Sequence, residues 1–493
     1  MGAIADILTE AGHNVTLLLP TLLVNEDGAD ATGVQLTKHI IRVPSDPRIK
    51  ELMVHKDAVL SQFWTAEPSI FGLMQMTQNM TTSFTYMCEG LLNNEQLLKQ
   101  LEEEKFDVGI AEPMNVCGFG IFELAKIKAA IGVLSVVHLD TVSTAIGEPV
   151  IPSYVPGPYS KYGDGMGFIE RAKNLLGVVL GQTTFVKVYH SETEAFRKKF
   201  GTHFKGYEQL LAETSYIMTN SNPYLDYPRP MLHKTVPIGG VAVSTDLKRN
   251  VLPPEFDAIL NERSSTVLVS FGSMAKGIHM PPEYINSLLS VFGSMPETTF
   301  IMKYEDKSSK IADHLPNVHL ISWFPQNALL ADPRLKAFIT HGGLGSTTEL
   351  AHQGKPAILI PLFGDQSRNA IMLAKHGGCI VLKKYDLAHP EILRRSLLSV
   401  LKDESYARNA KRLSEMLLSQ PVSAKQLLIR HCEFTAKFGR MPNLDPYGRQ
   451  LSFVQYYLID VALAVISIFI AVICICILVV RRCCSAIVKS KKD

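Results

Sequence analysis

The chain has 493 residues, which is enough for two or three domains with sizeable cores. Its 46% hydrophobic and 19% charged residues are typical of a folded protein and exclude a disordered chain. The net charge of +2, from 49 basic and 47 acidic residues, gives no reason to expect a nucleic acid partner.

The first twenty residues predict a helix and then a strand. Ile4, Ile7 and Leu8 have helical spacing, Gly12 ends the helix, and an apolar strand runs from Val15 to Leu19. A doubly wound domain normally opens with a strand that leads into its first helix. A secreted chain opens with a basic and then an apolar segment. We therefore expect the first strand and any secretion signal to lie upstream of Met1.

The sequence from Asp27 to Leu101 is less regular, with helical stretches from Ala58 to Met80 and from Glu95 to Glu104. Asn79-Met80-Thr81 is an acceptor sequence for N-glycosylation, so Asn79 is a candidate site if this domain is lumenal. Asn14 has the same pattern but leads directly into a strand, and we expect it to stay unmodified.

A strand from Phe106 to Ala111 delivers Glu112 to the carboxyl edge of a predicted sheet. On spacing alone, Glu112 is a charge at the start of a helix. Mostly helical sequence from Gly167 to Thr214 and a strand from Ser215 to Thr219 follow. We predict a first domain over residues 1–240 and a linker over residues 241–264, which contain a Pro-Pro pair.

Residues 265–433 predict a second domain in which strands are separated by helices. The predicted strands are Ser265–Ser270, Thr299–Tyr304, Val318–Ile321, Ala337–Thr340, Ala357–Ile360 and Ile380–Leu382. The predicted helices include Glu283–Phe292, Arg368–Lys375 and Pro390–Leu401. This alternation predicts a parallel sheet flanked by helices. The turn at Gly272 and Ser273, after the first strand, can bring an N–H and a hydroxyl close to a phosphate.

The most informative stretch runs from Trp323 to Gln366. Its centre is a strand, a turn from His341 to Gly345 and a helix, for which Ser346, Thr347 and Thr348 are expected to supply capping hydroxyls. A glycine turn before a helix leaves free backbone N–H groups at the positive end of the helix dipole, which is an anion site. His341 can add a hydrogen bond or a positive charge, and Glu349 can accept from ribose hydroxyls. For the His-Gly-Gly turn alone, a purely structural role is the alternative.

Together with Trp323, Gln326, Asp365 and Gln366, this stretch resembles the signature of the UDP-glycosyltransferase family, and more closely the animal UDP-glucuronosyltransferase-like enzymes. The resemblance implies an α/β fold in the GT-B arrangement, with two Rossmann-like domains and parallel sheets. It also implies a UDP-sugar as co-substrate, with no cofactor and no metal. One departure is Gly345, where the family commonly has Asn, so a side-chain contact is lost while the backbone donors remain.

The resemblance also assigns roles to the donor-site residues. They are Trp323 and Gln326 at the uracil and ribose, Glu349 at the ribose hydroxyls, Gly272, Ser273, His341, Gly343, Gly345 and Ser346 at the diphosphate, and Asp365 and Gln366 at the donor sugar.

For activity, the resemblance implies transfer of a hexosyl group from UDP-glucuronate or UDP-glucose to the hydroxyl of a small lipophilic acceptor, with inversion. Glu112 would be the carboxylate that orients a catalytic histidine. In the family this histidine lies just ahead of the first helix, which here is upstream of Met1, and His13 follows that helix and is no substitute. The alternative is a truncated, catalytically impaired form that binds UDP-sugar or regulates active homologues as a homo- or hetero-oligomer. A UDP-sugar hydrolase or epimerase is a third reading.

The C-terminus predicts a membrane anchor. Val461–Val480 has no charged residue and is long enough to cross a bilayer, so we predict a juxtamembrane segment over 434–457 and a transmembrane helix over 458–480. By the positive-inside rule, the basic tail, 481–493, lies in the cytosol and the preceding domains lie in the lumen. Its end, Lys489-Ser490-Lys491-Lys492-Asp493, resembles a dilysine signal for the endoplasmic reticulum membrane, and a short basic tail without a signal is the alternative.

The eight cysteines predict neither a disulfide framework nor a metal site. Four lie in or beside the predicted membrane helix, and the other four, Cys88, Cys117, Cys379 and Cys432, are scattered. No cysteine pair or Cys/His cluster has the spacing of a zinc site.

Overall fold

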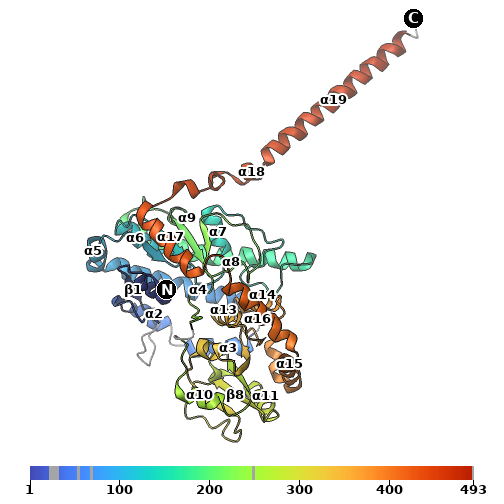
Figure 1. The fold of residues 1–493 in the computed structure, drawn as a ribbon. Coiled ribbons are helices and arrows are strands. Elements are labelled where there is room, and N and C mark those ends of the chain that lie inside the picture. The colour runs from blue at the N-terminus through green and yellow to red at the C-terminus, as the bar shows by residue number, and fades with distance from the viewer. Residues whose placement is uncertain (22–32, 53–55, 67–69, 247–249, 491–493) are drawn as a thin grey trace. The chain divides into compact units, whose positions relative to one another are not determined.

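The computed structural model describes residues 1–21, 33–52, 56–66, 70–246 and 250–490. The chain forms two units, Met1–Leu444 and Asp445–Asp493. The first unit contains two domains, each built on parallel strands, and the second is dominated by one long helix (Figure 1).

The C-terminal domain is built on a six-stranded parallel sheet. Its strands are β7 (Ser265–Ser270), β8 (Thr298–Lys303), β9 (Val318–Ile321), β10 (Leu335–Thr340), β11 (Ala357–Leu359) and β12 (Cys379–Val381). The strand order is β12-β11-β10-β7-β8-β9. The chain therefore winds outward in one direction from β7 and then in the other from β10. In such sheets the crevice between the first strand and the fourth is where ligands bind.

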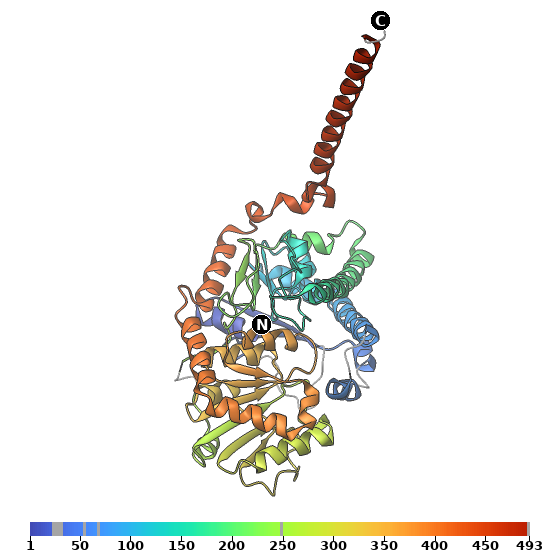
Figure 2. The same cartoon turned by 90° about the vertical axis from the view of Figure 1, so that its right-hand side faces the viewer.

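Both faces of this sheet are buried, as expected of parallel strands. Alternate residues of β7 enter separate cores: Val267 and Val269 lie in one, and Leu268 lies in the other. Helices cover both faces (Figure 2). α11 (Pro282–Gly293) and α15 (Pro390–Lys402) cover the first face. The second face is covered by α10 (Pro254–Leu260), α12 (Gln326–Ala331), α13 (Leu344–Gln353), α14 (Gln366–Ala374) and α16 (Glu404–Leu418).

The N-terminal domain has its parallel strands in two groups. β1 (Thr16–Pro20) pairs with β2 (His39–Val43). A separate four-stranded sheet has the order β3-β4-β5-β6, formed by β3 (Gly109–Ala111), β4 (Ala130–Val133), β5 (Tyr216–Thr219) and β6 (Thr235–Pro237). One face packs on α4 (Ile70–Asn93), α5 (Glu95–Glu103), α6 (Cys117–Leu124), α7 (Asp140–Ile146), α8 (Phe168–Phe200) and α9 (Tyr207–Ala212).

The other face of that sheet packs on helices from both ends of the unit. α1 (Gly2–Glu10) contributes Ile4 and Leu8 to this core, and α17 (Ala424–Phe438) contributes Leu428 and Cys432. The chain thus leaves the C-terminal domain after α16 and returns to the N-terminal domain. This crossing ties the two domains together through a shared apolar core.

The sequence predicted all six strands of the C-terminal domain to within two residues of their observed ends. In the N-terminal domain it predicted β1, β3 and β5 but missed β2, β4 and β6. The helical stretch expected from Ala58 to Met80 is two helices, α3 (Lys56–Thr65) and α4.

One disulfide joins a pair of the scattered cysteines, and the sequence analysis did not predict it. Cys88, in α4, is bonded to Cys117, at the start of α6, with a Cα–Cα distance of 5.7 Å and both side chains buried. The two residues are 29 positions apart and are brought together only by the packing of the N-terminal domain. Their spacing in the sequence therefore gave no sign of the bond.

We expect the Cys88→Ala/Cys117→Ala double variant to be less stable by about 3 kcal/mol, because the bond closes a medium-sized loop in the unfolded chain. Thermal unfolding of the detergent-solubilised protein, with and without reductant, measures the effect. Reductant should lower the midpoint of the unaltered protein and leave that of the double variant unchanged. Equal sensitivity of the two proteins to reductant would contradict the prediction.

The second unit contains α18 (Phe453–Tyr456) and α19 (Ile459–Ser490). Among the described residues, the stretch Ile459–Ala486 is the one helical segment long and apolar enough to cross a membrane. The helix is longer than the predicted transmembrane helix over 458–480 because Arg481, Arg482 and the residues after them continue it without a break.

Candidate functional site

The structure brings Gly272 and His341 together at the carboxyl ends of the neighbouring strands β7 and β10. A Cβ atom on Gly272 would lie 2.7 Å from His341 Nε2, and one on Gly343 would lie 2.6 Å from the same atom. Gly272 also has φ +86°, a conformation that favours glycine. Glycines on both sides therefore make room for the imidazole at the point where the sheet reverses its winding.

The surroundings of His341 favour the neutral form of its imidazole at physiological pH. Burial, with a further contribution from nearby Lys303, lowers the pKa of His341 to about 4. Its Nδ1 lies 3.3 Å from Thr340 Oγ1. Of the two roles expected from the sequence, a hydrogen bond or a positive charge, this environment favours the hydrogen bond.

The start of α13 has no side-chain cap. Gly343 is the N-cap residue, and the expected capping by Ser346, Thr347 and Thr348 is wrong because all three lie within the helix. Thr348 Oγ1 instead donates backward to the carbonyl of Leu344, at 2.7 Å. The first N–H groups of the helix are thus left for another acceptor. A Cβ atom on Gly345 would meet nothing within 4 Å, so this side of the turn is open.

Gln326, Ser346 and Glu349 form a hydrogen-bonded group between α12 and α13. Gln326 Nε2 donates to Glu349 Oε2 at 2.6 Å and to Ser346 Oγ at 3.1 Å. Burial raises the pKa of Glu349, and the bond from Gln326 offsets part of that rise. The amide holds the carboxylate in one orientation, which suits an acceptor for paired hydroxyls.

Glu349→Ala should weaken UDP binding about tenfold, because hydrogen bonds to a charged group contribute roughly 1.5–3 kcal/mol. The same substitution should leave the affinity for 2′,3′-dideoxy-UDP unchanged, because that ligand lacks the hydroxyls. Isothermal titration of both nucleotides makes the comparison. Glu415→Ala, which removes an exposed glutamate of α16, is the matched control. An equal loss for both nucleotides would contradict the ribose role of Glu349.

Trp323 offers a flat apolar face near Lys303. Its side chain is 75% exposed, which is unusual for a tryptophan, and Lys303 Nζ lies 5.2 Å from its ring centroid. An exposed aromatic face of this kind can stack on a heterocyclic base.

Asp365 and Gln366 lie at the start of α14, where both are engaged in local hydrogen bonds. Asn369 Nδ2 donates to Asp365 Oδ2 at 2.8 Å, and burial raises the pKa of Asp365. Gln366 Oε1 accepts from the N–H groups of Leu362, at 2.8 Å, and Phe363, at 3.1 Å. The side-chain oxygen of Gln366 thus shapes the preceding turn, so its amino group is the one left for a ligand.

Lys303 belongs to this site and was missed by the sequence analysis. It ends β8, and its Nζ donates to the carbonyl of Gly272 at 2.7 Å. Burial lowers its pKa, with opposition from Glu305. The signal that could have found it is a basic residue at the carboxyl end of the strand next to β7. Ser273, in the same turn as Gly272, is exposed.

Glu112 lies at the carboxyl edge of the other sheet, directly after β3. Its Oε1 accepts from the backbone N–H of Ser135, at 2.8 Å, and from the Ser135 hydroxyl. In the part of the chain that the structure describes, its hydrogen bonds go to no histidine. His13 is 3.3 Å from Glu433, on α17. Asn79 is exposed on α4, in a helix and not in a loop.

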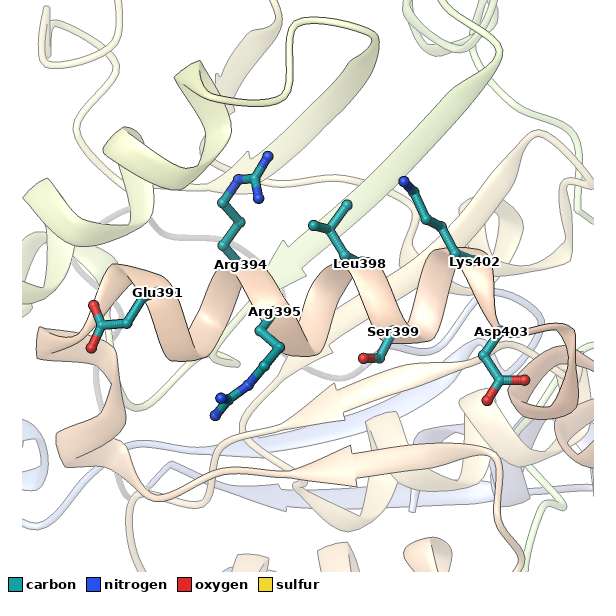
Figure 3. Close-up of a pocket in the computed structure, with 7 residues that line it drawn as sticks. All are labelled: Glu391, Arg394, Arg395, Leu398, Ser399, Lys402 and Asp403. Atoms are coloured by element: carbon teal, nitrogen blue, oxygen red, sulfur yellow. The ribbon is translucent and has the colours of Figure 1, made fainter.

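An open groove lies elsewhere on the C-terminal domain, along α15 (Figure 3). It is lined by Glu391, Arg394, Arg395, Leu398, Ser399, Lys402 and Asp403. None of these residues belongs to the predicted site, and nothing in the groove points to a ligand.

A search of protein families matches residues 1–493 to the family described as "UDP-glucoronosyl and UDP-glucosyl transferase". Among curated proteins, the chain is 30% identical to putative UDP-glucuronosyltransferase ugt-47 of Caenorhabditis elegans, over 93% of this chain and 85% of the relative. It is also 30% identical to human UDP-glucuronosyltransferase 1A1, over 76% of this chain and 68% of that protein.

Solved glycosyltransferases share the fold. One is UGT2 of Phytolacca americana complexed with UDP-2-fluoro-glucose and pterostilbene, with a TM-score of 0.56 and 15% identity over 88% of this chain and 95% of that chain. Another is the glycosyltransferase VinC in complex with dTDP, with a TM-score of 0.53 and 16% identity over 88% of this chain and 96% of that chain. These likenesses confirm the predicted GT-B arrangement.

Proposed function

Because the chain belongs to the UDP-glucuronosyl and UDP-glucosyl transferase family, we propose that it binds a UDP-sugar between the ends of β7 and β10 and transfers the hexosyl group to a small lipophilic acceptor. The observation that carries the proposal is the convergence of His341, the open start of α13 and the Gln326–Glu349 pair at one edge of the C-terminal sheet.

In this proposal each part of the donor has a chemically matched partner. Trp323 stacks on the uracil, and Glu349, oriented by Gln326, accepts from the ribose hydroxyls. Neutral His341, the first N–H groups of α13 and Lys303 bind the diphosphate. Asp365 and Gln366 bind the sugar. These donors suit a diphosphate leaving group, and we propose no cofactor or metal beside the UDP-sugar.

The proposed reaction is a single inverting displacement. The acceptor hydroxyl, held on the side of the N-terminal domain, attacks the anomeric carbon from the face opposite UDP and loses its proton to a general base. The bond to the diphosphate oxygen breaks as the new glycosidic bond forms. Glu112 is proposed to orient the base. Its position at the carboxyl edge of the N-terminal sheet supports this role.

The second candidate function is UDP-sugar binding without transfer, either alone or in an oligomer with active homologues. It is favoured by the hydrogen bonds of Glu112, which in the described part of the chain go to Ser135 and to no histidine.

One experiment separates the two functions. The full chain is purified in detergent, UDP binding is measured by titration, and transfer from UDP-glucuronic acid and UDP-glucose to a panel of phenols is assayed. Transfer that is lost in Glu112→Gln while UDP binding persists supports the enzyme. Binding without any turnover supports the regulatory function, and absence of UDP binding would overturn both.

We further propose that the protein is anchored in the membrane of the endoplasmic reticulum, with the domains lumenal and the C-terminal tail cytosolic. The apolar helix α19 and the basic residues at and after Arg481 support anchoring in this orientation. The Cys88–Cys117 bond adds support, since disulfides persist in oxidising compartments. The exposure of Asn79 is compatible with a glycan.

A further inference from the structure

Helix α3 belongs by sequence to the N-terminal domain but packs in the core of the C-terminal domain. The helix before it, α2 (Pro47–Leu52), places Ile49 in the N-terminal core, and α4, after it, places Cys88 there. Between them, Trp64 is fully buried in the core that contains β7 and α11. Figure 1 shows α3 against the C-terminal domain. Between Ile49 and Cys88, the chain thus passes from the N-terminal domain to the C-terminal domain and back.

Three contacts fasten the end of α3. Trp64 Nε1 donates to the carbonyl of Lys276 at 3.1 Å. The ring of Phe63 stacks on that of Phe363, with centroids 3.9 Å apart and planes at 15°. Lys384, in the 3₁₀ helix η2 (Lys384–Ala388), donates its ammonium to the carbonyls of Phe63 and Ala66. A cation at the carboxyl end of a helix is also favoured by the helix dipole.

The contacts of Trp64 and Phe63 fall on the two loops that flank His341. Trp64 packs edge-on against Phe271, with ring centroids 5.0 Å apart, and Phe271 directly precedes Gly272. Phe363 lies two residues before Asp365, and its N–H is bonded to Gln366. Both loops in turn touch the His341 turn. Gly272 abuts the imidazole, and a Cβ atom on Gly342 would lie 3.2 Å from the carbonyl of Gln366.

We propose that Phe63 and Trp64 are positioning residues for the donor: α3 holds the diphosphate loop through Trp64 and the sugar loop through Phe63. This inference rests on the proposed donor role of the His341 site. Neither residue is assigned contact with the donor. Trp64 and Phe63 each hold one loop in place. A small shift of either loop would misplace the groups that bind the UDP-sugar, and such shifts weaken binding and slow catalysis.

Because Phe63 and Trp64 hold different loops, substitutions at the two residues should affect UDP and UDP-glucose affinity differently. Loss of the Phe63 ring should disturb the Asp365–Gln366 loop and weaken UDP-glucose about fivefold, while affinity for UDP itself changes less than about twofold. Trp64→Phe, which keeps an aromatic ring but removes the bond to Lys276, should weaken UDP and UDP-glucose equally. A merely structural role would not separate the two ligands.

The test is titration of UDP and UDP-glucose into the 493-residue chain in detergent, for the unaltered chain and for Phe63→Ala, Phe63→Tyr and Trp64→Phe. Phe63 is only partly buried, so its truncation is compatible with folding, which the unfolding midpoint checks. Phe63→Tyr should restore UDP-glucose affinity. The matched control is Phe434→Ala, which removes one ring of an exposed aromatic pair on α17.

The outcomes distinguish the inference from the function on which it rests. UDP and UDP-glucose affinities in Phe63→Ala that equal those of the unaltered protein would overturn the positioning role and leave the donor site intact. An equal loss of both ligands in Phe63→Ala would also overturn it, because the sugar loop would then have no separate anchor. Absence of UDP binding by the unaltered chain would overturn the proposed function itself.

Discussion

His341→Ala should weaken UDP-glucose binding by roughly tenfold to a hundredfold, because a hydrogen bond to a charged group contributes about 1.5–3 kcal/mol. The imidazole lies between Gly272 and Gly343, where the ends of β7 and β10 meet. Its replacement by a methyl group removes a hydrogen-bonding group and leaves the sheet intact. Titration of UDP-glucose into the two proteins measures the loss.

The pH dependence of UDP-glucose affinity distinguishes a neutral His341 from a positively charged one. Because the folded pKa of His341 is about 4, the imidazole is uncharged throughout pH 5.5–8, and its titration should not change UDP-glucose affinity in that range. A charged imidazole would instead give tighter binding as the pH falls through 6.5. His314→Ala, at an exposed position in the same domain, is the matched control. Unchanged affinity in His341→Ala would remove the phosphate role assigned to this residue.

The strands and turns of the C-terminal domain could be predicted because each is marked by residues close together in the sequence. Each strand is a short apolar run, each turn is marked by glycine, and the order of elements is that of a parallel sheet. Where two turns follow adjacent central strands, they must meet, and so Gly272 and His341 could be placed together before the structure was known. The roles in donor binding of all the predicted site residues, His341 and Glu349 included, remain predictions.

The features that the sequence did not predict depend on contacts between distant segments. Lys303 is one basic residue among many until β8 is known to lie beside β7. Cys88 meets Cys117 only because α4 and α6 pack in one core. The capping expected of Thr348 failed because the helix begins earlier, at Leu344, and its hydroxyl turns back to that carbonyl. No periodic pattern in the sequence indicates that α3 packs against the C-terminal domain.

Glu192 is a buried acid that should make the stability of the protein depend on pH. It lies on α8 with no exposed surface, and its Oε2 accepts from the N–H groups of Val116, at 2.6 Å, and Cys117, at 3.0 Å. It therefore caps the start of α6. Burial raises its pKa to about 8, although these two bonds act in the opposite direction. The folded protein thus holds this side chain protonated at neutral pH, whereas the unfolded chain ionises it at about 4.5.

The sign of the effect follows from this difference. A group whose folded pKa is raised contributes stability that is fully present below the unfolded pKa and is lost as the pH rises through the folded value. Glu192 should therefore reduce the free energy of unfolding by up to about 3 kcal/mol between pH 4.5 and pH 7, at about 1.4 kcal/mol per pH unit.

Glu192→Gln keeps the shape and the acceptor oxygen of the protonated acid and removes the ionisation. We expect it to match the unaltered protein in stability near pH 4.5 and to become progressively more stable than it up to pH 8, as measured by the difference in denaturant midpoints in detergent. The difference is the informative quantity, because all other titrations cancel in it. Glu194→Gln, an exposed position on the same helix, should show no such divergence. Parallel curves for Glu192→Gln and the unaltered protein would mean that the folded protein ionises Glu192 as readily as the unfolded chain does.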